Sequence, residues 1–261
     1  MSRWVLGAPA ALVVAGAACA TRSLSNSGAV AAVVCGSLAV AAGWDWGIVL
    51  IAYFVTSSLL SRFRHEAKQR LTAGRLDKGG ARDAAQVLAN GGVFALASAG
   101  YVLTGTALWQ AVGAAALAAS AADTWATEIG SLARATPVSV LDWTPVQIGT
   151  SGGVTAQGFA AAFAGAAFVS VVCSLLRWSP IAVTAAMVGG VAGCLVDSML
   201  GASVQARRWC AACAMATEQR IHRCGAPTTI TGGWRWLDND GVNALSSLGG
   251  AFIGVTVASF V

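Results

Sequence analysis

The feature that most constrains this fold is a series of apolar segments, each about as long as a helix that crosses a bilayer. About 20 predominantly apolar residues span the hydrocarbon layer as a helix. Such long apolar runs exclude the alternating pattern of membrane barrel strands. The sequence therefore predicts an all-α polytopic membrane helical bundle with about eight transmembrane helices. We place them at 4–20, 28–43, 45–61, 84–103, 107–127, 158–176, 180–200 and 241–260.

Composition supports the same fold class. Hydrophobic residues make up 56% of the chain and charged residues only 10%, whereas soluble domains have about 25% charged residues. Gly and Ala crowd nearly every apolar segment. Because small residues let membrane helices approach closely, this crowding predicts tight helix packing rather than chemistry.

The basic residues predict the orientation. If both termini lie outside, every Lys and Arg except Arg3 and Arg177 falls at the cytoplasmic side, as the positive-inside rule requires. We therefore expect an integral membrane protein with its active site facing the cytoplasm. An alternative interpretation takes residues 1–20 as a cleaved signal peptide, which leaves the later topology unchanged. The expected organisation is N-terminal helices 1 to 3 (1–61), then a catalytic membrane domain (62–261) with cytoplasmic loops 62–83, 130–157 and 201–239.

Two carboxylates end a stretch that otherwise looks lipid-facing. In "ALAASAADTWATEIG", residues 116–130, Asp123 is followed five positions later by Glu128. Ionisable residues in a membrane segment are costly and indicate function by default. A separation of five does not place two side chains on one helix face. Either the helix breaks near Ala126, or the acids lie on two adjoining ridges, Asp123 with Thr127 and Thr124 with Glu128. The alternative to a functional role is an acid at the membrane interface that simply pairs with an Arg of a loop.

Three further segments carry polar residues at helical spacing at the same, cytoplasmic end. One such stripe is commonly explained by polar contacts between helices, but several stripes at the same leaflet predict a functional site. We expect Gln86, Asn90, Gln205, Asp240 and Asn243, together with Asn239, to contact substrate or nucleotide. The stripes are Arg82, Gln86 and Asn90; Asp197, Gly201 and Gln205; and Asp240, Asn243 and Ser247.

A glycine-rich loop, "PVQIGTSGGVTAQG" at 145–158, precedes a predicted helix. Free backbone N–H groups, hydroxyls and the positive end of a helix dipole favour phosphate binding. The loop lacks the Gly-Lys-Ser/Thr of a Walker motif, and a flexible connector is an equal alternative. The candidate phosphate-binding residues are Gly149, Thr150, Ser151, Gly152, Gly153 and Thr155.

The acids and bases near this loop suggest a metal-phosphate site. Mg²⁺ prefers one or two carboxylates, several waters and substrate phosphate oxygens, so Asp123, Glu128 and Asp197 are the expected Mg²⁺ ligands. Nearby cations are expected to neutralise the remaining phosphate charge; they are Lys68, Lys78 and Arg82.

A separate metal site is predicted in the last long loop. Cys210 and Cys213 form a C-x₂-C pair, and His222 and Cys224 follow. These are the ligand types of structural Zn²⁺, in a loop where disulfides are not expected. Such a site would staple the 201–239 loop beneath the bundle. The alternative is a set of reduced, unconnected thiols.

Five motifs in order resemble a known family. "ADTWATEIG", "PVQIGTSGGVTAQG", "VDSMLGASVQ", "HRCGAPT" and "WLDNDGVNALSS" are similar to a multi-pass membrane family once labelled only as a domain of unknown function, which includes the plant plastid phytyl-phosphate kinase. The resemblance runs from about residue 60 to the C-terminus, and the first two segments match little. It implies phosphoryl transfer from a nucleoside triphosphate, with CTP expected, to an isoprenoid monophosphate, and kinship with dolichol and phytol kinases. The matching positions are Asp123, Glu128, Gly149 to Gly153, Asp197, Asp240 and Asn243.

Residues and resemblance together predict a Mg²⁺-dependent kinase of phytyl phosphate or another prenyl phosphate. An acceptor that is already a phosphate monoester is anionic and needs no strong general base. A cytidylyltransferase that releases pyrophosphate is the second enzyme hypothesis, and a lipid-phosphate transporter is the alternative outside enzymes. No nucleic acid partner is expected. The expected catalytic residues are Asp123, Glu128, Asp197, Lys78 and Arg82.

Overall fold

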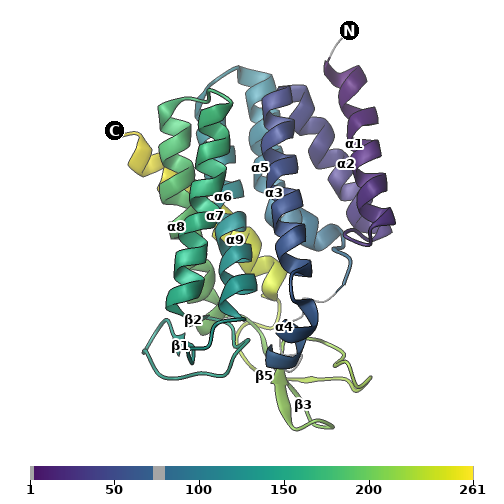
Figure 1. Ribbon diagram of the computed structural model, residues 1–261, viewed down its shortest axis with the longest axis vertical. Helices are drawn as coiled ribbons and strands as arrows, with labels where there is room; N and C mark the ends of the chain where they lie inside the picture. The colour runs from purple at the N-terminus through teal and green to yellow at the C-terminus, as the bar shows by residue number, and fades with distance from the viewer. Residues whose placement is uncertain (1–2, 73–79, 261) are drawn as a thin grey trace.

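The eight predicted apolar segments form eight long helices in a computed structural model of the protein, which describes residues 3–72 and 80–260 (Figure 1). Their ends agree with the expected ranges to within a few residues. One short helix, α4, was not expected. The helices are α1 (Arg3–Ala20), α2 (Asn26–Ala42), α3 (Trp44–Arg62), α4 (His65–Thr72), α5 (Ala84–Thr104), α6 (Leu108–Gly130), α7 (Ala156–Leu175), α8 (Pro180–Ser203) and α9 (Asn239–Ala258).

Length and hydropathy mark most of these helices as membrane spans. Among the described residues, α3, α5, α7, α8 and α9 are each long and apolar enough to cross a bilayer. Shorter apolar helices cover Gly7–Ala20 and α2. The prediction of a helical membrane bundle is therefore confirmed.

Helix α6 is the central helix of the bundle. It packs against α3, α5, α7, α8 and α9, and residues 113–123 are all buried. Many of them are alanines, so neighbouring helices approach closely. The impression that this stretch faces lipid is wrong, because an apolar segment with small side chains suits a protein interior as well as a bilayer.

Glycines bring α8 and α9 together. A Cβ atom added to Gly189 would lie 2.4 Å from the carbonyl oxygen of Gly250, and one added to Gly254 would lie 2.5 Å from the carbonyl oxygen of Ala185. Any larger residue at either position would push the helices apart. The small residues thus serve packing, as predicted.

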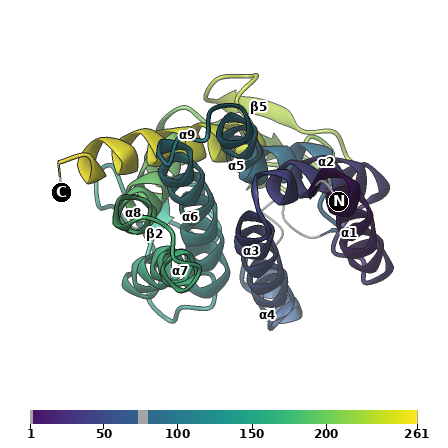
Figure 2. The ribbon, with the colours of Figure 1, turned by 90° about the horizontal axis from the view of Figure 1, so that it is seen from above.

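Helices α1 to α3 lie along one side of the bundle (Figure 2). Helix α1 packs on α2, α2 packs on α5, and α3 packs on α6 and α7. At the start of α3 the buried Trp46 ring contacts Phe94, Tyr101 and Trp178, with centroids 4.8 to 5.4 Å apart. These aromatic contacts tie α3 to α5 and to the α7–α8 turn.

The loops at the end of the bundle opposite the α7–α8 turn carry small antiparallel sheets. Strands β1 (Val138–Ser139) and β2 (Gly153–Val154) pair with each other. Strands β3 (Arg207–Cys210), β4 (Met215–Thr217) and β5 (Thr229–Gly232) form a second sheet in the order β4-β3-β5. Both sheets and α4 lie at one end of the helices, away from both chain termini (Figure 1). The described parts of the loops predicted to share one side therefore do lie at one end of the molecule.

Candidate functional site

The polar helix ends enclose two pockets at the end of the molecule that carries the sheets. The larger, which we call the basic pocket, has a volume of about 460 Å³, and the smaller, the acidic pocket, about 130 Å³. The charged residues that define the basic pocket are Arg22, Arg62, Lys68, Arg82, Glu128 and Asp240. Those that define the acidic pocket are Asp123, Asp197 and Glu218.

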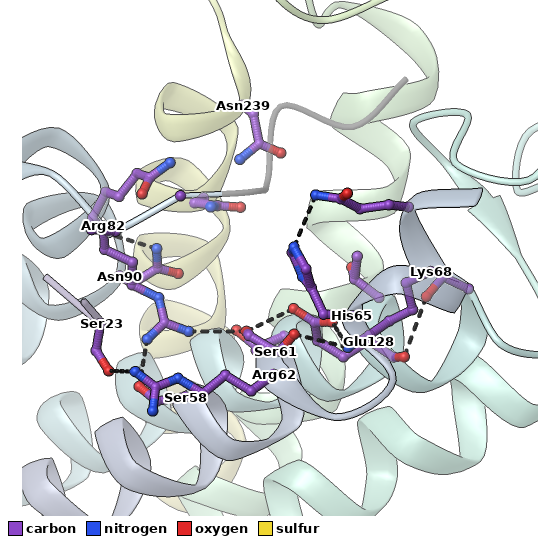
Figure 3. A pocket seen from close by; sticks show the side chains of 18 of the residues that line it. Ser23, Ser58, Ser61, Arg62, His65, Lys68, Arg82, Asn90, Glu128 and Asn239 are labelled. Atoms are coloured by element: carbon purple, nitrogen blue, oxygen red, sulfur yellow. Dashed lines mark hydrogen bonds and ion pairs between the residues drawn. The ribbon is translucent and has the colours of Figure 1, made fainter. Parts of the chain in front are cut away.

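Two arginines of the basic pocket keep their charges available. The half-buried Arg82 donates from Nη1 to Ser58 Oγ at 2.8 Å and from Nη2 to Ser61 Oγ at 3.2 Å. Arg62 donates to Ser23 Oγ at 2.7 Å (Figure 3). Among the described residues, no carboxylate lies within 4.0 Å of either guanidinium. Both arginines are held in place by neutral groups, so their positive charge can meet an anion.

The backbone of Arg82 is anchored as firmly as its side chain. Its N–H donates to the carbonyl oxygen of Ser23 at 3.0 Å, and its carbonyl oxygen accepts from the N–H of Ser25 at 2.9 Å. A Cβ atom on Gly28 would lie 2.0 Å from the same carbonyl oxygen. The start of α5 is therefore fixed against the α1–α2 turn.

Glu128 belongs to the basic pocket, where it is ion-paired with Lys68. It also accepts from Ser61 Oγ at 2.7 Å, and Lys68 Nζ donates to the carbonyl oxygen of Leu60 at 2.7 Å. Both side chains are largely buried, with exposed fractions of 8% for Lys68 and 13% for Glu128. Glu128 is therefore occupied in holding α4 against α6.

This placement corrects the predicted Mg²⁺ ligand set of Asp123, Glu128 and Asp197, because Glu128 does not line the pocket that the other two carboxylates share. Helix α6 runs unbroken to Gly130, and five residues turn an α-helix by about 140° beyond one full turn. Thr124 and Glu128 line the basic pocket, whereas Asp123 lines the acidic pocket. Of the two interpretations, the adjoining ridges hold and a break at Ala126 does not.

Glu218, and not Glu128, is the third carboxylate that lines the acidic pocket with Asp123 and Asp197. It lines the acidic pocket and accepts hydrogen bonds from Ser151 Oγ and, at 3.0 Å, from Gln205 Nε2. Glu218 was not among the residues predicted from the sequence. It lies just after β4 in a polar loop, where no apolar segment or helical spacing singles it out.

The carboxylates of the acidic pocket do not form a closed set of metal ligands. In the described part of the chain, the loop cysteines and histidine form the one group of three or more such side chains whose ligand atoms all lie within 4.8 Å. Asp123, Asp197 and Glu218 do not form one. A closed set is not required for Mg²⁺, which needs only one or two carboxylates when water and phosphate oxygens complete its octahedron.

The glycine-rich loop forms a wall of the acidic pocket. All of 148–155 lines it. Gly152 has φ +75°, and a Cβ atom there would lie 2.4 Å from Ala202 Cβ, so the loop packs directly on the end of α8. Glycine is required because an L side chain is strained at this φ and has no room.

Part of the predicted phosphate cradle is already used by the protein. The N–H of Thr150 donates to the carbonyl oxygen of Gln147 at 3.1 Å, and that of Gly153 to the carbonyl oxygen of Thr150 at 3.0 Å. Thr155 Oγ1 caps α7 by accepting from the N–H of Gly158 at 3.0 Å. We therefore correct the prediction for these donors, because the loop folds as a tight turn and not as an open nest.

The three polar stripes reach the pockets as expected. Arg82, Gln86 and Asn90 line the basic pocket. Asp197, Gly201 and Gln205 line the acidic pocket, although α8 ends at Ser203 and Gln205 lies beyond it. Lys78 lies in 73–79, outside the described residues.

The first turns of α9 contribute to both the pocket and the core. Asp240 and Asn243 line the basic pocket. Asn243 is 4% exposed, and its Oδ1 has no hydrogen-bond partner among the described residues. Ser247 lies deeper, 3.0 Å from Ser120 Oγ. A buried acceptor without a partner is costly, so Asn243 is placed to accept a hydrogen bond from a ligand.

The two pockets meet at the C-terminal end of α6. Thr127, Ser131 and Asn239 line both of them. A third pocket of about 330 Å³, which we call the loop pocket, shares Gln205, Glu218 and Asn239 with the acidic pocket. The loop pocket also includes Arg208 and Arg220. A row of basic, acidic and loop pockets therefore runs from the helix ends into the extramembrane loops.

The four predicted zinc ligands come together in the last long loop. The sulfur atoms of Cys210 and Cys224 lie 3.7 Å apart, and His222 Nδ1 lies 3.2 Å from Cys224 Sγ. A tetrahedral Zn²⁺ with bonds of about 2.3 Å to sulfur requires sulfur atoms about 3.8 Å apart. The hydrogen bond from His222 is the main cause that lowers the pKa of Cys224 to about 6, whereas hydrogen bonding to Cys224 raises that of Cys213 to about 11. The spacing and ligand types fit a closed structural site.

Comparison with known proteins identifies the family. The family described as "Integral membrane protein DUF92" matches residues 9–251. The chain belongs to the DUF92 family. The match begins within α1, so the similarity extends further toward the N-terminus than the sequence motifs indicated.

Two relatives are similar to this chain along most of their length. "Protein PGR" of Arabidopsis thaliana is 30% identical over 259 residues, covering 89% of this chain and 88% of the relative. An uncharacterized membrane protein of Methanocaldococcus jannaschii is 31% identical over 188 residues, covering 70% and 75% respectively. No solved structure matches the chain. DUF92 membership confirms the family resemblance and the integral membrane character, while the names of the two relatives state no reaction.

Proposed function

We propose that the protein is a kinase that transfers the γ-phosphoryl group of a nucleoside triphosphate, CTP in the first instance, to an isoprenoid monophosphate. The observation that supports this most is the junction of the basic and acidic pockets at Thr127, Ser131 and Asn239. A reaction between two phosphate-bearing molecules needs cations for the acceptor and carboxylates for the metal of the donor, within reach of each other.

The basic pocket is the proposed site of the acceptor phosphate. A phosphate monoester carries a charge of about −1.5 to −2 at neutral pH. Arg62 and Arg82 have no carboxylate partner among the described residues, and guanidinium groups bind phosphate oxygens in pairs. Asn243 Oδ1 can accept from a protonated phosphate oxygen or an ordered water beside it. Lys68 is neutralised by Glu128 and serves to position α4.

The acidic pocket is the proposed site of Mg²⁺ and the triphosphate. Asp123 and Asp197 would hold the ion, whose remaining positions take water and phosphate oxygens. Glu218 adds negative charge and is fixed by Ser151 and Gln205. The adjoining loop pocket offers space for the nucleoside beside Arg208 and Arg220.

The proposed reaction requires the protein mainly to position the acceptor and donor phosphates. An anionic oxygen of the acceptor phosphate attacks the γ-phosphorus and forms a new P–O bond, while the bond between the γ-phosphorus and the β-bridging oxygen breaks and CDP leaves. Because the attacking oxygen is already anionic, no strong base is required. Arg62 and Arg82 would offset the negative charge that builds as the two phosphates approach.

The proposed orientation follows from the charges of the loops. In the described part of the chain, most Lys and Arg residues lie in or beside the loops at the end that carries the sheets. The positive-inside rule places such loops in the cytoplasm, where nucleotides and Mg²⁺ are available. The isoprenoid tail would remain in the membrane.

The proposal includes a structural Zn²⁺ at Cys210, Cys213, His222 and Cys224. These residues tie β3 to the 222–224 turn. That turn follows directly on Ile221, which lines the loop pocket. Zinc would thus hold the wall of the nucleoside site without taking part in the reaction.

Product analysis tests the kinase. Detergent-purified protein is incubated with Mg²⁺, geranylgeranyl monophosphate and CTP labelled at the γ-phosphate. We expect label in the lipid diphosphate, and loss of that product in Asp123→Asn and Asp197→Asn. Asp142→Asn, an exposed carboxylate outside both pockets, is the matched control and should remain active.

Other products would overturn the proposal in distinct ways. Label released only as pyrophosphate, with a CDP-linked lipid, would identify a cytidylyltransferase. No turnover with any nucleotide or prenyl phosphate would contradict an enzyme role and favour transport of the lipid phosphate. In that case cysteine labelling should find the outer halves of the helices accessible to water.

A further inference from the structure

An apolar groove of about 160 Å³ opens into the basic pocket. Its walls come from α1, α2, α3 and α5, and the two cavities share Tyr53, Arg82, Gln86 and Asn90. Apart from these residues the groove is lined almost wholly by apolar side chains and glycines. It therefore leads from the apolar part of the helix bundle to the basic pocket.

We propose that this groove, bounded by α1, α2, α3 and α5, binds the part of the isoprenoid tail next to the phosphate. The inference rests on the proposed function for the identity of the lipid. It adds where the lipid tail lies and which helices contact it. The phosphate would lie at Arg82 and the chain would extend along α3 toward Trp44.

The dimensions fit one chain segment. The lining of α3 runs from Trp44 to Phe54, which corresponds to about 15 Å along a helix and to about half of the hydrocarbon layer. Ile48 is 49% exposed and Ile51 is 41% exposed, so the groove is open along its side. The rest of a long tail can lie in the bilayer.

The floor of the groove is made of small side chains. Ala11 of α1 and Gly36 of α2 pack so closely that a Cβ atom on Gly36 would lie 3.1 Å from Ala11 Cβ. Ala15 and Ala32 also line the groove. These residues leave a narrow trough against which a single methyl-branched chain can pack.

Charge complementarity selects an anionic amphiphile as the occupant. Arg82 is the only charged residue among those described that line the groove, and it lies at the end that meets the basic pocket. Its guanidinium lies 5.9 Å from the centroid of the Phe54 ring. A lipid with a phosphate head and one apolar chain matches this order of groups, with the head at Arg82 and the chain beyond Phe54.

Photo-crosslinking tests the location directly. The probe is a geranylgeranyl monophosphate analogue with a diazirine on its second isoprene unit, applied to the full chain in detergent and in phosphatidylcholine vesicles. We expect cross-links on 44–54 and 10–18, and competition by unlabelled monophosphate but not by the neutral alcohol. Labelling spread over α7 and α8, or equal competition by phosphatidic acid, would overturn the assignment.

A filling substitution tests the same groove by kinetics. Ile51→Trp places a large ring in the groove, while Val55→Trp makes a similar change one turn further on at a position outside the groove and equally exposed, at 44%. For Ile51→Trp we expect a KM about tenfold higher for the C20 substrate, the factor expected when about two methylene groups lose buried contact. The KM of dimethylallyl monophosphate, whose tail occupies only the phosphate end of the groove, should rise much less. Val55→Trp should match the unmodified protein with both substrates.

The outcomes separate this inference from the proposed function. Normal turnover without cross-links in the groove, or an equal effect of both Trp substitutions, would overturn the groove and leave the kinase standing. Cross-links in the groove without any turnover would overturn the kinase and leave a lipid-phosphate site standing.

Discussion

Lys68 of α4 is ion-paired with Glu128 of α6, and both side chains are almost completely removed from solvent. The two residues are 60 positions apart in the chain. Because the pair joins a loop helix to the central helix of the bundle, it fixes one wall of the basic pocket. Removing one partner would leave the other as a buried, uncompensated charge.

Lys68→Met is therefore expected to lower the stability by about 3 to 5 kcal/mol, the usual cost of breaking a buried pair. The double variant Lys68→Met with Glu128→Leu should recover most of that loss, because no charge remains buried. Thermal unfolding in detergent measures both. Arg70→Met is the matched control, since its pair with Glu66 is 80% and 85% exposed and exposed pairs contribute little. A similar shift for Arg70→Met and Lys68→Met would show that burial does not set the cost.

Asn243 offers a test in which stability and ligand binding move in opposite directions. Asn243→Leu has a similar volume and removes a buried acceptor without a partner among the described residues, so we expect unchanged or higher thermal stability. Binding of geranylgeranyl monophosphate should weaken by about tenfold, the value of one hydrogen bond of about 1.4 kcal/mol. Equilibrium binding with labelled lipid measures this. A loss of stability with unchanged binding would assign Asn243 a packing role only.

Gly152→Ala tests the packing of the glycine-rich loop on α8. Gly152 and Gly105 both have positive φ, +75° and +67°, but an added Cβ meets Ala202 at 2.4 Å only at Gly152, while nothing lies within 4 Å at Gly105. Both substitutions should cost about 1 kcal/mol of backbone strain. We expect Gly152→Ala alone to lose phosphoryl transfer, because it displaces the wall of the acidic pocket. Equal activity of the two variants would argue against a role of the loop.

The Cys210, Cys213, His222 and Cys224 cluster predicts about one bound zinc per chain, measured by elemental analysis of purified protein. Cys210→Ser should abolish the zinc, whereas Cys19→Ser, at the end of α1, should retain it. Chelation should expose the 201–239 loop to trypsin, since its arginines would lose their fixed positions. Full zinc content in Cys210→Ser would rule out this ligand set.

The sequence predicted the helices, their order and the end at which polar residues gather, because apolar length and the i, i+4 spacing are local properties of the chain. Gln86 and Asn90 lie on one face of α5 for this reason, and they line one pocket together with Arg82, which lies just before the helix. The cluster of Cys210, Cys213, His222 and Cys224 was also predictable from the sequence, because the ligand types are recognisable and the four residues lie within one short loop.

What only the tertiary structure decided is which polar groups face one another. Asp123 and Glu128 are close in sequence, yet α6 turns them into different pockets. Glu218 reaches Ser151 across 67 positions, a contact that no spacing in the sequence encodes. The joining of the basic and acidic pockets, and the groove between α1 and α3, arise from helix packing. Such relations depend on the rotation and approach of whole helices, and many distant small residues set these together.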